Sequence, residues 1–423
     1  MKKNHRAWFV LAGCCVVTFL GMGLGMHTVG LYFPSISAEF DAGIAQVSAM
    51  MAFTALGIFI GMPIMGIIMP KMNLRILMTI CVSLMAGGQL FNSFAIVLPM
   101  LYIGNIMIGL AWTLLPGILN AVVLGNWFSK RLGFALGVVT CISAFGGALL
   151  NPIFSVLITN LGWRMSYRIS ALLIVAIMLP VVWIFIRFAP KDGETPYGAE
   201  EADVIAAKAD AQPKTMEGFT FKQAIRSGVF YVLFFSGAVM ALQGGMAQQI
   251  SMHVTTSVGL PLTVAATIMS GFLIGSATGN LTLGILLDMK PVRSLIIFML
   301  AGVLGWLGLA YMQTQILLIM SGFLMGTAQS TLIVGQDYIA RRVFGGREFS
   351  RISAVQNMIL GVVPALSIIG VGAIYDATGS FTIPFTLGAV VVPVSICLLI
   401  AGYKISVKMK AANETVVAEE ETQ

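Results

Sequence analysis

Long apolar runs, separated by only a few polar residues each, constrain this 423-residue chain more than any other feature of its sequence. Hydrophobic residues make up 58% of the chain and charged residues only 10%, against about 25% charged residues in an ordinary soluble domain. So few charges cannot cover the surface of a soluble protein of this size, whereas a surface that faces hydrocarbon needs few. The sequence therefore predicts an all-α membrane protein that is embedded in the lipid bilayer.

The number of helices follows from the length of each apolar run. About 20 helical residues cross the roughly 30 Å of hydrocarbon, because each residue advances the helix by about 1.5 Å. The start of the first run, up to Cys14, also resembles a lipoprotein signal, but the run continues to Phe33, which favours a membrane span. We expect twelve transmembrane helices, at residues 8–33, 44–69, 75–94, 96–125, 134–159, 166–188, 228–256, 262–287, 293–312, 315–340, 352–374 and 381–404.

A polar stretch after the sixth run divides the chain into two pseudo-symmetric halves. We expect a six-helix half at 1–189, a linker at 190–227, a second six-helix half at 228–405 and a tail at 406–423. The end of the linker, 219–228, is suited to a short surface helix. Residues of the same type recur about 218 positions apart, which indicates a repeat. The pairs are Gly57/Gly275, Gly61/Gly279, Gly66/Gly284, Arg75/Arg293, Gly104/Gly322, Phe128/Phe344, Arg131/Arg347 and Gly162/Gly379.

The distribution of basic residues predicts the orientation in the membrane. If the N-terminus lies inside, every Lys and Arg among the 24 falls on the inner side except Arg164 and Arg168. Basic residues concentrate in cytoplasmic loops, so we expect both termini in the cytoplasm. We expect the membrane to be a plasma membrane, namely a bacterial inner membrane. The same bias accounts for the net charge of +7, and we expect no nucleic-acid partner.

Several other classes of site find no support in the sequence. The five cysteines all fall within apolar runs and match no metal-binding spacing. The glycine series Gly57/Gly61 and Gly271/Gly275/Gly279 has the small-xxx-small spacing of close helix packing and not that of a phosphate loop. We therefore expect no cofactor, no metal, no enzymatic activity and a monomeric protein.

Two six-helix halves joined by a long linker resemble the major facilitator superfamily. Its signature after the second helix of each half is Gly, then Asp, then basic residues, and GILLDMKPVR (284–293) keeps it through Gly284, Asp288, Lys290 and Arg293. GIIMPKMNLR (66–75) has Pro70 in place of the acid but keeps Lys71 and Arg75. The resemblance implies that this motif latches a cytoplasmic gate, with the second-half copy carrying more of that role.

Three further stretches resemble the oxalate/formate antiporter and monocarboxylate transporter branch of that superfamily. They are NWFSKRLGFALG (126–137), ARRVFGGREFSRI (340–352) and GAIYDATGSF (372–381). The branch implies transport of organic anions. In the oxalate transporters cationic residues of the eighth and eleventh helices neutralise the dicarboxylate, yet no Lys or Arg lies within 262–287 or 352–374 here. Because an unpaired buried anion is costly, a monoanion or a neutral molecule is favoured over a dianion.

Candidate ligands for the substrate are the polar residues of the helices that line the pathway in this superfamily, the first, fourth, seventh and tenth, and of the eleventh. An ionisable group within a membrane is expensive and usually functional, which favours His27, deep in the first helix. For each amide an interhelical hydrogen bond is an equally good explanation. The candidates are His27, Tyr32, Asn105, Trp112, Thr113, Asn120, Gln243, Gln248, Gln249, Gln329, Gln356 and Asn357.

The charged residues at the cytoplasmic ends of helices are more typical of a gate than of a substrate site. We expect gating roles for Lys71, Arg75, Asp288, Arg293, Asp337 and Arg341, and a structural role for Asp376 outside. The glycines Gly244 and Gly245 beside Gln243 are suited to a hinge. The sequence favours a secondary transporter of a small organic anion, with an exporter of drug-like or neutral molecules as the alternative. Uniport, exchange and proton coupling all stay open.

Overall fold

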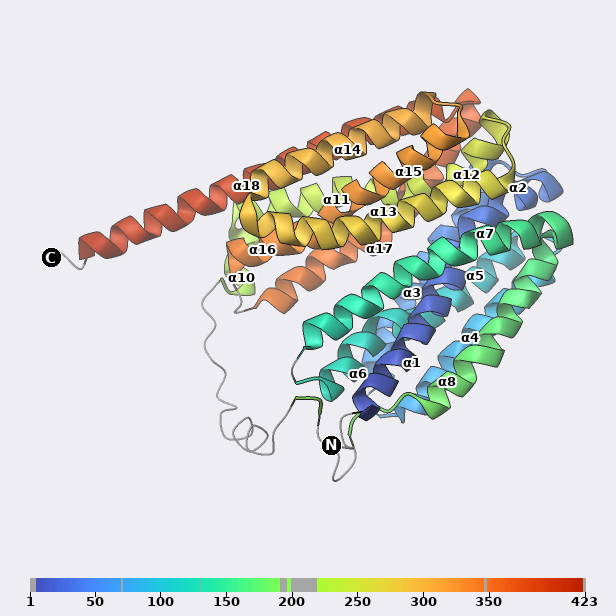
Figure 1. Cartoon of the computed structure of the whole chain (residues 1–423), viewed down its shortest axis with the longest axis horizontal. Coiled ribbons are helices and arrows are strands. Elements are labelled where there is room, and N and C mark those ends of the chain that lie inside the picture. The colour runs from blue at the N-terminus through green and yellow to red at the C-terminus, as the bar shows by residue number, and fades with distance from the viewer. Residues whose placement is uncertain are drawn as a thin grey trace. The chain divides into compact units, whose positions relative to one another are not determined.

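The computed structural model describes residues 5–69, 71–129, 131–190, 196–198, 219–345 and 348–420, and in these residues every regular element is helical and no strand occurs (Figure 1). Short π-helical segments, labelled η, interrupt several of the α-helices. The elements up to the linker are α1 (His5–Met22), η1 (Gly23–His27), α2 (Val29–Phe40), α3 (Ile44–Ile68), α4 (Leu74–Ser93), α5 (Leu98–Trp112), η2 (Thr113–Ile118), α6 (Leu119–Trp127), α7 (Leu132–Leu173), η3 (Ile174–Met178) and α8 (Leu179–Ile184).

The elements after the linker repeat this mixture of α- and π-helical segments. They are α10 (Phe221–Arg226), α11 (Gly228–Gln248), α12 (Ile250–Met252), η4 (His253–Ser257), α13 (Leu262–Met289), α14 (Pro291–Tyr311), α15 (Gln315–Ser330), η5 (Thr331–Gly335), α16 (Gln336–Phe344), α17 (Phe349–Thr378) and α18 (Thr382–Glu420). The short α10 agrees with the surface helix predicted at the end of the linker.

Ten helical stretches of the described chain are long and apolar enough to cross a membrane. Large apolar side chains cover their outer faces: Leu172, Ile285 and Leu304 are each more than 60% exposed, as befits residues that face hydrocarbon. The protein is therefore a multi-pass membrane protein. One of the ten stretches, Leu132–Ile184, is 53 residues long and bends at Gly162, where φ is 81°. A side chain is strained at this φ, which explains the glycine.

Helix boundaries differ from the predicted ones mainly where a helix continues beyond the expected membrane edge. The first helical stretch was expected to end at Phe33, before Pro34, but α2 carries Pro34 within the helix and ends at Phe40. The last helix was expected to end near residue 404, yet α18 runs to Glu420. The sequence after Gly402 contains no proline or glycine, so nothing in it breaks the helix.

The described chain forms two compact units, which do not coincide with the halves defined by the linker. Unit 1 contains residues 1–212 together with 248–274 and 368–380, and unit 2 contains 213–247, 275–367 and 381–423. Three helical stretches thus pass from one unit to the other, at 247/248, 274/275 and 367/368. Each crossing lies near a residue that loosens or bends a helix, namely Gly245, Gly275 and Pro364.

Within each unit the second and fourth long helices pack through glycines at matching positions. A Cβ added to Gly57 of α3 would collide with the Ile106 carbonyl oxygen of α5, and one added to Gly275 of α13 would collide with the Phe323 carbonyl oxygen of α15. Only glycine permits such an approach of two backbones. The same kind of contact thus recurs about 218 residues later. Gly162 and Gly379 likewise share a positive φ, of 81° and 69°.

Both ends of the linker contact their own unit at matching positions. In unit 1, the Tyr197 amide donates to the Trp127 carbonyl at 2.7 Å, and the Ser129 amide donates to the Tyr197 carbonyl at 3.1 Å. In unit 2, the Phe219 amide donates to the Phe344 carbonyl at 2.8 Å. These contacts lie beside Phe128 and Phe344, one of the predicted repeat pairs. The linker residues 191–195 and 199–218 lie outside the described residues.

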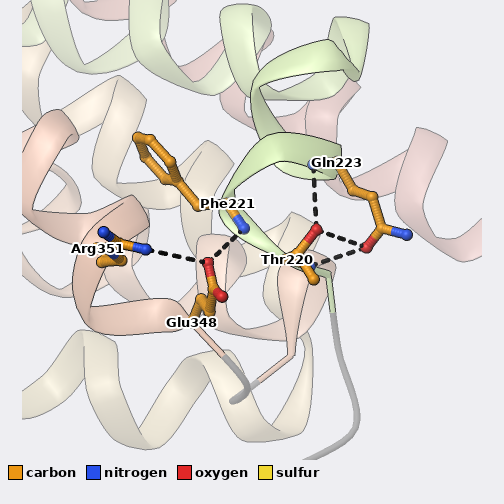
Figure 2. A network of polar contacts seen from close by, with 5 residues as sticks. All are labelled: Thr220, Phe221, Gln223, Glu348 and Arg351. Carbon is orange, nitrogen blue, oxygen red and sulfur yellow. Dashed lines mark hydrogen bonds and ion pairs between the residues drawn. The ribbon is translucent and has the colours of Figure 1, made fainter.

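A capping box begins α10 just after the linker (Figure 2). The Gln223 amide donates to Thr220 Oγ1 at 3.4 Å, and the Thr220 amide donates to Gln223 Oε1 at 2.9 Å. The Phe221 amide donates to Glu348 Oε2 at 2.7 Å, and Arg351 forms an ion pair with the same oxygen at 3.9 Å. This network joins the start of α10 to the segment between α16 and α17.

The two arginines expected outside hold the α4–α5 connection. Arg164 forms an ion pair with Glu39 and donates from Nη2 to the Ala95 carbonyl at 2.9 Å. Arg168 lies over the Phe94 ring, with 5.1 Å between its Cζ and the ring centroid. Trp163 donates to the other Glu39 oxygen at 2.6 Å. Arg164 and Arg168, the two basic residues expected on the outer side, therefore connect the end of α2 and the α4–α5 connection to the helix at the Gly162 bend.

Candidate functional site

Five helical stretches of the described chain contain a π-helical segment, and these segments point to the candidate site. A π-helical turn inserts one extra residue into an α-helix and is frequent at functional sites. Four of the segments, η1, η2, η4 and η5, lie in the first, fourth, seventh and tenth of the predicted spans. The first residues of η2 and η5, Thr113 and Thr331, stand 218 positions apart, as do five of the eight predicted repeat pairs.

Polar and aromatic side chains from three helices surround η1 within unit 1. From α4, Gln89 donates through Nε2 to the Leu24 carbonyl at 2.9 Å. From α5, Trp112 approaches Gly25, where an added Cβ would lie 3.6 Å from Trp112 Cδ1. From η1 itself, His27 packs on α7, because a Cβ on Gly147 would lie 2.6 Å from His27 Cβ. Asn151 follows Gly147 by one helical turn and so lies on the same face of α7.

Each of these four residues has a buried polar atom without a hydrogen-bond partner among the described residues. The atoms are His27 Nε2, Trp112 Nε1, Gln89 Oε1, and both the Oδ1 and Nδ2 atoms of Asn151. A buried polar atom without a partner costs about 1–3 kcal/mol, and native proteins leave few of them. We call His27, Gln89, Trp112 and Asn151 the η1 polar cluster. It combines three groups that can donate, an imidazole, an indole and an amide, around one backbone segment.

Four of the predicted candidates instead use their polar groups in packing. Asn105 accepts from Thr54 Oγ1 at 3.1 Å and donates to the Leu101 carbonyl at 2.7 Å. Asn120 donates to Thr18 Oγ1 at 3.0 Å. Thr113 donates to the Gly109 carbonyl at 3.2 Å, and Gln243 accepts from Trp306 Nε1 at 2.9 Å. Asn105 and Asn120 thus contact different helices, α3 and α1.

Three further candidates contact other helical segments within unit 1. Tyr32 is buried and stacks on Tyr167, with 4.1 Å between ring centroids. Gln249 donates through Nε2 to Ser48 Oγ at 2.5 Å and to the Ile368 carbonyl at 3.1 Å. Gln248 approaches Gly30, and its Oε1 has no partner among the described residues. The helix is interrupted at Gln249, four residues after the glycine pair that predicted a hinge.

The remaining amide candidates belong to unit 2. In the described part of the chain, Gln329 Oε1 is buried without a partner, and so are both polar atoms of the Gln356 side chain. Asn280 Oδ1 shares this property, and its helix packs closely against α15, where Gly279 approaches Ser330. Asn357 lies in α17, but its side chain is outside the described part of the chain.

The predicted gating residues lie at helix ends. Arg75 donates through Nε to the Ile186 carbonyl at 3.0 Å, and Asp337 accepts from Ser353 Oγ at 3.5 Å. Lys71, Asp288, Arg293 and Arg341 are exposed. Asp288 forms no ion pair with any residue that the structure describes, and Pro70 lies outside the described residues.

Gln89 and Asn151 were not among the predicted candidates, because those candidates lie in the helices that the family resemblance assigns to the pathway and in the eleventh. Both residues lie in other helices, α4 and α7. A usable signal was present, since each is an amide inside a predominantly apolar run. Such a residue in a membrane helix needs a partner or a function.

The sequence matches a known protein family. The model of the "Major Facilitator Superfamily" matches residues 11–253 and 233–418. Monocarboxylate transporter 11 of Homo sapiens is 24% identical over 91% of this chain and 75% of its own length. Monocarboxylate transporter 12 of Rattus norvegicus is 24% identical over 90% of this chain and 82% of its own length.

Solved structures give the same fold at lower identity. The nucleoside transporter NupG superposes with a TM-score of 0.69 at 16% identity, covering 93% of this chain and 99% of its own. A bacterial homologue of the human lysosomal transporter Spinster, in an inward-facing and unoccupied conformation, superposes with a TM-score of 0.69 at 13% identity, covering 96% of both chains. These likenesses establish the fold and leave the substrate to be argued from the site.

Proposed function

Because the chain belongs to the Major Facilitator Superfamily, we propose that it is a secondary transporter of a small organic anion, with a monocarboxylate as the favoured class. It is a membrane transporter and not an enzyme. The proposal adds the substrate class and the mode of action, which is alternating access of two six-helix halves about a central site. It also includes a location in a bacterial plasma membrane, with both termini in the cytoplasm.

The ten apolar stretches support a count of twelve spans in two halves. The stretch Leu132–Ile184 counts as two spans because of its bend at Gly162. The shorter apolar segment Val362–Thr378, extended by the rest of α17, adds the twelfth. The matched glycine contacts of α3 with α5 and of α13 with α15 support the division into duplicated halves.

The η1 polar cluster is the observation on which the substrate class rests. A carboxylate is an acceptor-only group that takes several hydrogen bonds. The His27 imidazole, the Trp112 indole and the Asn151 amide offer donors around one π-helical segment that have no partner among the described residues. Hydrogen bonds to an ionised acceptor are roughly twice as strong as neutral ones. One carboxylate would therefore satisfy groups that are otherwise costly to bury.

The same cluster favours a single negative charge. It contains no permanent cation, and protonated His27 could compensate one charge and not two. This agrees with the absence of Lys and Arg within 262–287 and 352–374. The curated relatives are named monocarboxylate transporters, which supports the same class. His27 also provides the one titratable group of the cluster, so exchange of a proton with the substrate would occur there.

The remaining predicted residues receive secondary roles in this proposal. Gln329 and Gln356, whose polar atoms find no partner in the described part of unit 2, are the second-half candidates for substrate contact. Asp288 and Arg293 stay candidates for the cytoplasmic gate, with Lys71, Arg75, Asp337 and Arg341. The amides of Asn105, Asn120 and Gln243 are assigned to helix packing.

Counterflow in proteoliposomes tests the proposed substrate class. Vesicles loaded with an unlabelled compound accumulate the labelled compound transiently only if both are carried. We expect short monocarboxylates to support counterflow and dicarboxylates to fail. Parallel runs with and without a pH gradient separate exchange from proton coupling. Counterflow by neutral or drug-like compounds, with no competition from any carboxylate, would instead support the exporter hypothesis.

A further inference from the structure

One carboxylate caps a helix that lies 332 residues away from it in the sequence. The Ile44 amide donates to Asp376 Oδ1 at 2.9 Å, and the Ala45 amide donates to Asp376 Oδ2 at 3.0 Å. Asp376 belongs to the last turn of α17, and Ile44 and Ala45 begin α3. Both partners lie in unit 1. One carboxylate therefore binds two of the free amides at the start of a helix from another half of the chain.

The start of α3 has no cap of its own. Its N-cap residue is Gly43, which has no side chain to accept a hydrogen bond, although Ser, Thr, Asp or Asn is usual at this position. A Cβ on Gly43 would lie 2.8 Å from Asp376 Oδ2. The glycine thus provides the space into which the distant carboxylate fits. A negative charge at this place also interacts favourably with the helix dipole.

A second glycine brings the two helices together. A Cβ on Gly372 of α17 would lie 2.7 Å from both the N and Cα atoms of Ala45. These are backbone atoms, so they cannot move aside as a flexible side chain would. Gly370, on the same helix, has no described atom within 4 Å of its added Cβ. The close approach is therefore local to the face of α17 that carries Asp376.

Other contacts in unit 1 join the first six helical spans to segments of the second half. Gln249 donates to Ser48 at 2.5 Å, Ser270 donates to the Ala148 carbonyl at 2.8 Å, and Ser251 donates to the Gly30 carbonyl. All of these groups are neutral. The contact of the Asp376 carboxylate with the Ile44 and Ala45 amides, by contrast, involves a charged group. Charge-assisted hydrogen bonds are stronger than neutral ones.

We propose that Asp376 is the latch of the outer gate, and that its contact with the start of α3 forms and breaks once in each transport cycle. The inference rests on the alternating access proposed above and not on the identity of the substrate. When the outer side opens, the Ile44 and Ala45 amides exchange the carboxylate for water, because they lie at the end of the helix. The contact can therefore reform, and it biases the protein toward the state in which the outer side is closed.

A distance measurement on the full-length protein tests the latch. Spin labels at Ile96→Cys and Ala377→Cys, both exposed positions, report the separation between the α4–α5 connection and the end of α17. The five native cysteines are replaced in this background. Asp376→Asn turns one acceptor oxygen into a donor that opposes a backbone amide. In this variant we expect the ratio of molecules with a short label-to-label distance to molecules with a long one to fall about ten-fold.

Two controls match the variants in chemistry. Asp41→Asn removes the same charge from the loop just before α3, and Asn tolerates the left-handed backbone of Asp41, where φ is 48°. It should leave the distance distribution unchanged. Gly372→Ala should lower the short-distance population by sterics, whereas Gly370→Ala should not. Gly372→Ala also keeps the test valid if Asp376→Asn does not fold.

The proposal is overturned if Asp376→Asn and Gly372→Ala, each monodisperse in gel filtration, give the distance distribution of the parent protein. It is also overturned if Asp41→Asn or Gly370→Ala shifts the distribution as much as its partner variant. A failure of the carboxylate substrate assignment would leave this result unaffected, because the measurement needs no substrate.

Discussion

Two groups of residues with buried polar atoms in unit 1 have similar chemistry and different surroundings. Asn105 and Asn120 direct their amides to Thr54 and Thr18 on neighbouring helices. His27, at the end of η1, and Trp112 and Asn151, on neighbouring helices, have buried polar atoms without partners among the described residues. Polarity inside a membrane helix is therefore a poor guide to function on its own. The η1 polar cluster is distinguished by polar atoms that have no partner in the described part of the chain. Three substitutions test this distinction.

The largest effect is expected for His27→Ala. The substitution removes the group that would compensate the substrate charge, and a lost hydrogen bond to a charged group costs about 1.5–3 kcal/mol. Transport measured as kcat/KM should fall up to about 100-fold. Thermal unfolding should change little, since His27 Nε2 has no partner to lose among the described residues. Uptake into proteoliposomes and a melting curve on the same preparation provide the two readouts. Unchanged uptake would exclude His27 from the site.

An intermediate effect is expected for Asn151→Leu. The variant keeps the side chain's overall shape and removes two polar atoms that are buried without partners in the described chain. We expect kcat/KM to fall about ten-fold, because one neutral donor to the carboxylate is lost. Replacing an unsatisfied buried amide by an apolar group should also maintain or raise the melting temperature. A lowered melting temperature with full transport would assign Asn151 to packing.

The smallest effect on transport is expected for Asn105→Ala. This amide bonds to Thr54 and to the Leu101 carbonyl, so its loss should act on stability. Interhelical hydrogen bonds in membranes contribute about 0.6 kcal/mol on average. We expect a slightly lower melting temperature and unchanged uptake per folded molecule. A transport defect as large as that of Asn151→Leu would remove the distinction between the two groups.

The fold could be predicted from the sequence because it depends on properties that the sequence carries locally. Apolar runs predict the helices, and the close packing predicted at Gly57 and Gly275 is confirmed by their contacts with neighbouring backbones. The end of the first helical stretch was harder to predict. Pro34 disrupts an isolated helix, but the contacts around α2 keep the helix intact to Phe40.

The candidate site could be predicted only in part, because the hydrogen-bond partners of a buried side chain are known only once the chain has folded. His27 and Trp112 stood out as polar groups in apolar runs, and the structure places His27 in η1 and Trp112 beside it. Asn105 looked the same in sequence, and only its distance to Thr54 identifies it as a packing residue. The cap of Asp376 on α3 joins residues more than 300 positions apart, and no local pattern connects them.

Direct observation of His27 tests the central claim. The chain contains three histidines, so a sample with ¹⁵N-labelled histidine in nanodiscs gives few ring signals, and His27→Gln assigns those of His27. Addition of a transported monocarboxylate should shift the His27 signals and leave those of His5 unchanged. A dicarboxylate that is not transported should have no effect. If a transported monocarboxylate leaves the His27 signals unmoved, the substrate does not bind at the η1 polar cluster.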